Sequence, residues 1–348
     1  MIPAYAPDAT PEELLCNSET PRLHSQLRRM SAKEFDTGRH LYRHQVEAIR
    51  RIQSGRNAVV ATGTGSGKTE AFLLPILDHC ARTSHKGVQA ILVYPMNALA
   101  NDQLDRLRAL LGDSGITIGR YTGQTPRDAE DLDEDTRKNA KTFERSTREQ
   151  IRQTPPQILL TNFAMLEYLL LRPSDQTIFK DENVQFVVLD EAHSYRGSQG
   201  IDISLLMKRL QLRFSRKLQF ILTSATLGDS KDPSNKERIA KYASELSGAA
   251  IEPEDVIGGH IVDPFDGAGR EELPANAVEQ IAQISAADVI TSLNSLEGIR
   301  ELLQRIGLPI GDGKKPPDIL YASLRRLAPL HRFYRRLREG PATVEALA

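Results

Sequence analysis

The sequence contains no tryptophan, only two cysteines and a formal net charge of −1. Cys16 and Cys80 stand outside any metal-ligand spacing, so they exclude a disulfide framework and favour a reducing compartment. The near-zero charge gives no global signal of a nucleic-acid partner, although a local basic patch could still bind one. Aromatic residues make up 5% of the chain, so the core must be mainly aliphatic.

Long apolar runs are also missing. No run approaches the roughly 20 residues that a membrane-spanning helix needs, and Met1–Tyr5 lacks the basic and apolar regions of a signal peptide. These absences predict a cytoplasmic protein. A length of 348 residues, with 40% hydrophobic and 26% charged residues, is ordinary for a globular chain and sufficient for two domains.

Short apolar runs alternate with helical patterns through the middle of the chain. Buried strands are predicted at 58–60, 90–94, 116–118, 158–161, 184–189 and 218–222. This alternation predicts an α/β fold, a parallel sheet with helices on both faces. Right-handed crossovers would bring the C-terminal ends of the strands to one edge, where such sheets bind ligands.

The chain divides into three regions by composition. Residues 1–35 are rich in proline and are predicted to be an N-terminal extension, and residues 36–265 form the α/β domain. Residues 266–348 show helical periodicity and no buried strand, so they are predicted to be a helical linker or accessory region. Arginines of the stretch 325–338 form either a solvated helix face or a phosphate-binding surface.

A glycine-rich stretch, Ala61–Thr69, stands between a predicted strand and a predicted helix, the context that a phosphate-binding loop requires. Lys68 would reach the terminal phosphates of the nucleotide, and the Thr69 hydroxyl would bind Mg²⁺. Thr62 replaces the first glycine of the general pattern. The residues expected around the nucleotide phosphates are Thr64, Gly65, Ser66, Gly67, Lys68 and Thr69.

Polar residues follow the next buried strands. Asp190 would hold Mg²⁺ through water, and Glu191 would orient and deprotonate the water that attacks the terminal phosphate. His193 could meet the hydroxyls of Ser224 and Thr226 across the crevice, and this pair would sense the phosphate state.

One glutamine precedes the loop. Gln45 lies in a predicted helix, and its amide could pair with an adenine edge because it both donates and accepts hydrogen bonds. The alternative is an exposed glutamine without a ligand.

The segments Thr62–Thr69, Asp190–His193 and Ser224–Thr226 occur in this order within residues 40–265. They resemble motifs I, II and III of superfamily 2 DEAD/DEAH-box helicases. Gln45 falls where that family has its adenine-reading Q motif, and Tyr94–Gln103 resembles motif Ia. The stretch Asp190–Gly197 resembles the Lhr-like and MrfA-like branch of large DNA helicases. The resemblance implies the ATP-binding lobe of a RecA-like P-loop NTPase, with catalytic roles for Lys68, Asp190, Glu191 and His193 and with ATP and Mg²⁺ as cofactors.

The resemblance also implies contacts to the backbone of one nucleic-acid strand, single-stranded or partly duplex. Such contacts would track the strand without reading its bases, through helix N-termini and small polar side chains. A turn or a helix cap is the alternative for each residue, above all for Asn97. The expected contact residues are Pro95, Asn97, Gln103, Thr122, Gly123, Thr161 and Asn162.

Helicases of this superfamily close the ATP site with a second RecA-like lobe that brings an arginine finger. No second run of buried strands follows Thr226, so we expect that lobe in a longer polypeptide or a partner chain, and slow ATP hydrolysis by this chain alone. The favoured function is an ATP-dependent DNA helicase or translocase. An RNA-remodelling enzyme and a non-enzymatic ATP-binding or assembly subunit are the alternatives.

Overall fold

The computed structural model describes residues 7–15, 27, 29–30, 36–83, 86–132, 134, 137, 141–180, 183–225, 233–259, 271–272, 277–313 and 315–332. The chain divides into two compact units, residues 1–261 and 262–348, and each is considered by itself. Among the described residues, every helix is too short or too polar to cross a membrane.

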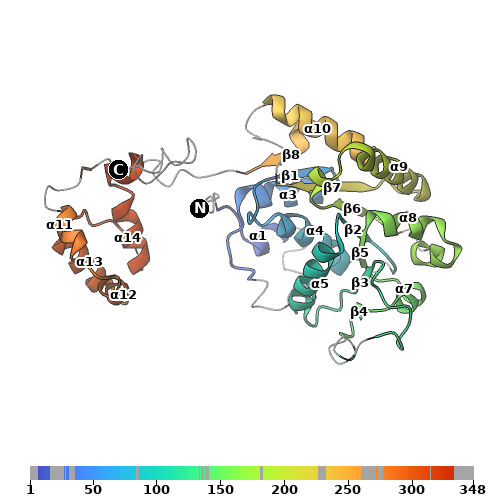
Figure 1. The fold of residues 1–348 in the computed structure, drawn as a ribbon, viewed down its shortest axis with the longest axis horizontal. Helices are drawn as coiled ribbons and strands as arrows, with labels where there is room; N and C mark the ends of the chain where they lie inside the picture. Colours follow the sequence, from blue (N-terminus) through green and yellow to red (C-terminus); the bar gives the residue numbers. More distant parts are fainter. Residues whose placement is uncertain are drawn as a thin grey trace. The chain divides into compact units, whose positions relative to one another are not determined.

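The first unit is built on one sheet of eight strands, all paired in parallel (Figure 1). In sheet order, the strands are β4 (Glu144–Arg145), β3 (Ile118–Tyr121), β5 (Ile158–Asn162), β2 (Ala90–Tyr94), β6 (Phe186–Leu189), β7 (Gln219–Ser224), β1 (Ala58–Ala61) and β8 (Val256–Gly258). Because every pair is parallel, the C-terminal ends of the strands share one edge.

Helices cover both faces of this sheet, which confirms the predicted fold class. Successive strand residues point to opposite faces, so Val60 and Leu92 belong to one core while Val59 and Val93 belong to the other. The first core is closed by α3 (Arg43–Gln53), α4 (Lys68–Arg82) and α5 (Asn97–Leu111). The second is closed by α7 (Arg148–Gln153), α8 (Phe163–Leu171), α9 (Gly197–Arg213) and α10 (Pro233–Ser247) (Figure 1).

Short helices complete the unit: α1 (Pro11–Leu15) and the 3₁₀ turns η1 (Pro173–Phe179), η2 (Ala192–Ser194) and η3 (Pro253–Asp255). Reciprocal hydrogen bonds between Thr10 and Glu13 cap the start of α1. The Thr10 N–H donates to Glu13 Oε2 at 2.7 Å, and Thr10 Oγ1 accepts from the Glu13 N–H at 3.3 Å.

Three strands differ from the sequence predictions. β4 and β8 were not predicted, because two and three residues are too few to show a period or an apolar run. The strand predicted at 116–118 begins at Ile118 instead and continues to Tyr121. The cause is local, since the Thr117 N–H donates to Gln157 Oε1 at 3.1 Å rather than to a neighbouring strand.

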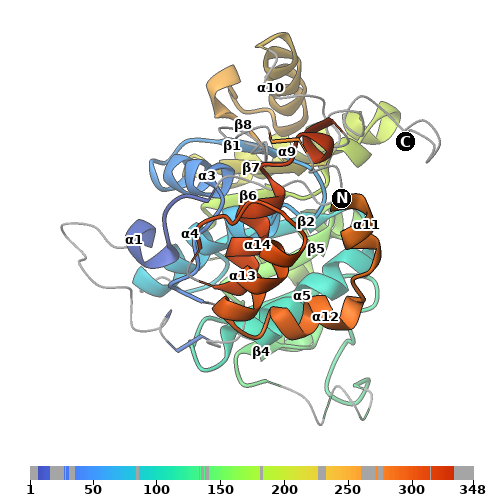
Figure 2. The same cartoon turned by 90° about the vertical axis from the view of Figure 1, so that its left-hand side faces the viewer.

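The second unit is helical where it is described, with α11 (Ala277–Ala282), α12 (Ala286–Ser292), α13 (Leu296–Arg305) and α14 (Pro316–Leu324). Helices α13 and α14 pack side by side around Ile299, Leu303 and Ile319 (Figure 2). Arg332 Nη1 lies 2.8 Å from Glu272 Oε1, and Arg326 pairs with Glu271. These two arginines are therefore neutralised within the unit, which favours the solvated-face alternative; residues 333–348 lie outside the described residues.

Candidate functional site

The loop between β1 and α4 has the left-handed glycines expected of the predicted phosphate nest. Gly65 and Gly67 adopt φ values of 74° and 75°, which only glycine takes without strain, and a Cβ on Gly67 would collide with the Gln45 amide. Thr62, at the position of the missing glycine, bonds through its hydroxyl to the Ser66 hydroxyl at 2.6 Å. The threonine therefore stabilises the loop by a hydrogen bond between its first and its fifth residue.

Lys68 begins α4 and is 9% exposed. Its Nζ donates to the carbonyls of Thr62 at 3.1 Å and Gly63 at 3.3 Å, so the ammonium lies across the start of the loop. Burial lowers the pKa of this ammonium, while the charges of Glu191 and Asp190 raise it. The loop and the acidic pair thus face one another, as the sequence predicted. Thr69 follows in the first turn of α4 and is partly exposed.

Asp190 follows β6 and is 8% exposed. Burial raises the pKa of its carboxyl, and the hydrogen bond from the Thr223 hydroxyl opposes that rise. The Thr223 hydroxyl also accepts from the Glu191 N–H at 3.1 Å, so one side chain orients both acids. Sequence reasoning missed Thr223. The signal was the shared end of two apolar runs, because Leu189 pairs with Leu222 and the next residues are Asp190 and Thr223.

Removing this hydroxyl should loosen the acidic pair. We expect Thr223→Val, which keeps the side-chain volume, to reduce Mg²⁺-dependent ATP affinity about fivefold to tenfold, since it leaves a buried carboxylate and an N–H each short of one hydrogen bond. Thr223→Ser should keep affinity within about twofold because the hydroxyl remains. Titration with a fluorescent ATP analogue would measure both variants, and equal affinities for valine and serine would contradict the assigned role.

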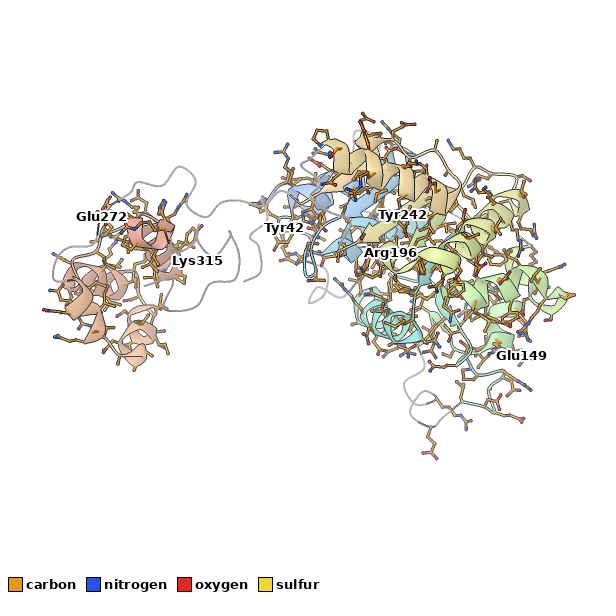
Figure 3. The ribbon with its side chains drawn as sticks, turned by 45° about the horizontal axis from the view of Figure 1, so that its top comes forward. Tyr42, Glu149, Arg196, Tyr242, Glu272 and Lys315 are labelled. Carbon is orange, nitrogen blue, oxygen red and sulfur yellow. The ribbon has the colours of Figure 1, made fainter. Side chains whose placement is uncertain are left out.

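Glu191 has a left-handed backbone, with φ 48° and ψ 47°, and is the one non-glycine residue with positive φ in the described part of the chain. This conformation costs about 1–2 kcal/mol in a residue with a Cβ. The η2 turn that follows is anchored to α10, because the Tyr242 hydroxyl donates to the carbonyls of Ala192 at 2.7 Å and Tyr195 at 2.6 Å (Figure 3).

His193 connects the acidic pair to the neighbouring strand. Its Nδ1 lies 3.2 Å from Glu191 Oε2 and 3.3 Å from the Ser224 hydroxyl. The predicted meeting of His193 and Ser224 is therefore present. Thr226, predicted to join them, lies outside the described residues.

Gln45 is 1% exposed, so the exposed alternative is wrong. Its amide nitrogen donates to the Gly67 carbonyl at 3.0 Å and to Glu70 Oε2 at 2.8 Å, and its oxygen accepts from the Tyr42 N–H at 2.7 Å. The amide thus ties α3 to the phosphate nest. Contact with adenine stays a prediction, and it would require this amide to exchange at least one N–H partner.

The sheet order separates the predicted site residues into two neighbouring groups. Apart from Gln45, which precedes β1, the predicted nucleotide-site residues follow or end β6, β7 and β1, which are adjacent in the sheet. The predicted strand contacts follow or end β3, β5 and β2, which are also adjacent. Both groups therefore lie on one edge of the sheet, and they meet where β2 pairs with β6.

Two asparagines join the strand-contact segments. Asn97 is the first residue of α5, after the N-cap Met96, so the alternative in which Asn97 caps this helix is wrong. Its Oδ1 instead accepts from Asn162 Nδ2 at 2.7 Å. Asn162 is itself the N-cap of α8, because its side-chain oxygen accepts a hydrogen bond from the Met165 N–H at 2.8 Å.

The other predicted contacts differ in access. Thr122 and Thr161 are buried, and both hydroxyls bond within the protein. The Thr161 hydroxyl donates to the Tyr121 carbonyl at 2.7 Å, and the Thr122 hydroxyl accepts from the Gln124 N–H at 3.3 Å. Gly123 is exposed, and Pro95 and Gln103 are partly exposed. Gln103 lies on α5, about 9 Å along the helix axis from Asn97.

Arg148 was not singled out from the sequence. Its guanidinium bonds to the carbonyls of Thr122 and Gly123 at 3.1 Å each and lies 5.5 Å from the centre of the Tyr121 ring. A cation therefore stands at this edge of the sheet. The sequence offered little signal for it, since Arg148 belongs to a charged segment that is rich in both signs.

The donor set at the nucleotide half fits Mg²⁺. This ion prefers oxygen ligands and commonly takes one or two carboxylates together with substrate phosphates. Asp190 presents a carboxylate whose pKa is raised by burial and by the neighbouring charge of Glu191, and Thr69 presents a hydroxyl in the first turn of α4. These two residues would hold the ion, as predicted from the sequence.

Comparison with known proteins gives consistent matches. The family described as DEAD/DEAH box helicase matches residues 42–232. The Druantia protein DruE of Escherichia coli (strain UMEA 4076-1) is 30% identical to this chain, over 88% of the chain and 22% of DruE. The uncharacterized ATP-dependent helicase YprA of Bacillus subtilis (strain 168) is 32% identical, over 55% of the chain and 24% of YprA.

Among solved structures, the crystal structure of the DUF1998 helicase MrfA bound to DNA matches with a TM-score of 0.51 and 21% identity. The match covers 88% of this chain and 40% of that one, and at this identity it bears on the fold alone. The chain spans about a quarter or less of the length of DruE and YprA.

Proposed function

This chain belongs to the DEAD/DEAH box helicase family, and from that premise we propose that it is the ATP-binding lobe of a helicase or translocase. In this proposal, ATP hydrolysis drives movement along a nucleic-acid strand, DNA in preference to RNA. The observation that carries the proposal is the meeting of Lys68, Asp190 and Glu191 at one sheet edge, beside the strand-contact half.

Each group at this edge has a chemical task in the proposed reaction. The N–H groups of the nest and the Lys68 ammonium bind the phosphates, and Glu191 accepts the proton of the attacking water. Mg²⁺, held by Thr69 and by Asp190 through water, would neutralise charge on the phosphates. The Thr223 hydroxyl holds Asp190 and Glu191 in position relative to each other. The contact between His193 and Ser224 would transmit the phosphate state of the bound nucleotide to β7.

The choice of DNA rests on relatives. MrfA is described as bound to DNA, and extension of that substrate to this chain belongs to the proposal. We also propose that a second RecA-like lobe, in the same polypeptide or a partner chain, completes the active site by supplying an arginine finger. The protein would act in the cytoplasm.

Binding and turnover measurements on the purified chain test this function. We expect ATP to bind with Mg²⁺ and single-stranded DNA to bind more tightly than RNA of the same sequence, while turnover alone stays slow. An arginine finger can contribute roughly 10³–10⁵ in rate, so addition of the second lobe should raise turnover by orders of magnitude. Equal stimulation by RNA would favour an RNA-remodelling enzyme, and no turnover with that lobe would favour a non-enzymatic subunit.

A further inference from the structure

Glu70 joins three helices at the back of the phosphate nest. It lies in the first turn of α4, and its Oε2 accepts from Gln45 Nε2 of α3 at 2.8 Å. Oε2 also accepts from Arg39 Nη2 at 2.7 Å, and Oε1 accepts from Arg106 Nη2 of α5 at 3.2 Å. One carboxylate therefore links α3, the nucleotide loop and the helix that begins with the predicted strand contacts.

Stability alone does not account for this arrangement. The Glu70 side chain is 23% exposed, and the two arginines are 56% and 43% exposed. Ion pairs with this much solvent access contribute little to folding because water and salt screen them. Their geometry still connects the elements, because Oε2 of Glu70 accepts from Gln45 and Arg39 while Oε1 accepts from Arg106 of α5.

The link spans the distance between the two halves of the site. Arg106 lies on the same helix as Asn97, about 14 Å further along its axis. At the other end, Gln45 donates one N–H to Glu70 and the other to the Gly67 carbonyl within the nest. A change in the hydrogen bonds of Gln45 when a nucleotide binds would therefore change the bonds of Glu70, and with them the hold on α5.

We propose that Glu70 is a positioning residue that couples nucleotide binding to nucleic-acid binding through Arg106 and α5. This inference rests on the proposed function, because it requires both ligands. Coupling of this kind is reciprocal, so each ligand must change the affinity for the other by the same factor. Removal of the Glu70 charge should lower that factor without removing either binding site.

The test measures the affinity for a non-hydrolysable ATP analogue with and without saturating single-stranded DNA. For the unmodified chain we expect the two affinities to differ at least about fivefold, within the usual range of coupling. Glu70→Gln should reduce this difference to about twofold or less, while affinity without DNA changes less than about twofold. Arg106→Gln should give the same loss, and the double variant should lose no more than either single one.

A matched control is available on α8 and α9, where Glu167 Oε1 lies 2.8 Å from Arg209 Nη1 and the side chains are 46% and 52% exposed. Glu167→Gln should leave the coupling unchanged. Equal weakening with and without DNA in Glu70→Gln, or additive losses in the double variant, would overturn the inference. So would the absence of any coupling in the unmodified chain. Failure of that chain to bind ATP or DNA at all would instead overturn the proposed function.

Discussion

Replacement of Lys68 with alanine should weaken ATP binding by at least about a hundredfold. The Nζ lies 3.1 Å and 3.3 Å from two loop carbonyls, so it is already held where the terminal phosphates would bind. Hydrogen bonds to charged groups contribute about 1.5–3 kcal/mol each, and two such bonds correspond to roughly 10²–10⁴ in affinity. The loss also leaves Asp190 and Glu191 without the nearby cation that offsets their charge.

Isothermal titration with ATP and Mg²⁺ would measure the affinity of this variant. Alanine favours the helical conformation at the start of α4, so the fold should survive, and circular dichroism can check it. Lys241→Ala, an exposed lysine of α10, is the control and should bind ATP normally. Full affinity in Lys68→Ala would remove the loop from the nucleotide site and refute the proposed function.

The sequence predicted most of the sheet because six of its strands contain short apolar runs, which indicate burial on both faces. The six predicted runs all became strands, although one of them moved along the chain to Ile118–Tyr121. β8 was not predicted because Val256–Gly258 is short, and this segment is defined as a strand only by its pairing with β1. Pairing across the sheet is a long-range property, so no local pattern could reveal it.

The site shows the same division between local and long-range information. The glycines of the nest and the acids after β6 were predicted, because they form short motifs of consecutive residues that can be recognised from the sequence alone. The roles of Thr223 and Glu70 depend on partners 33 and 36 residues away, Asp190 and Arg106. The bonds of Gln45 depend on Gly67, which is 22 residues away. Such partners become neighbours only when the strands take their order in the sheet.

Thr62 illustrates how a departure from a motif can be compensated. A threonine at this position brings a Cβ where the general pattern has glycine, yet Thr62 has no positive φ. Its N–H donates to the Ser224 carbonyl at 3.1 Å, which continues the pairing of β1 with β7 into the loop. The loop therefore begins as an extension of the strand, and the left-handed turns fall only at Gly65 and Gly67.

Replacement of Glu191 with glutamine should abolish hydrolysis while ATP binding persists. A positioned general base contributes about 10²–10⁴ in rate, so we expect the rate to fall by at least about a hundredfold. Affinity for ATP should stay equal or increase, because a negative charge near the phosphates is removed. Single-turnover hydrolysis of radiolabelled ATP, with the chain in excess, can measure this even when turnover is slow, and Glu245→Gln, an exposed acid of α10, is the control.

Glycine at the same position separates the chemistry of Glu191 from its backbone strain. Glu191→Gly should be as inactive as Glu191→Gln, yet more stable to unfolding by roughly 0.5–1 kcal/mol. Relief of the left-handed conformation gains about 1–2 kcal/mol, and the greater freedom of glycine in the unfolded chain takes back about 0.5–1 kcal/mol. Thermal unfolding should show a difference of about 1–4 °C. A glycine variant no more stable than the glutamine variant would mean that the backbone strain is no larger than the entropic cost of glycine, and rapid hydrolysis by either would exclude Glu191 as the base.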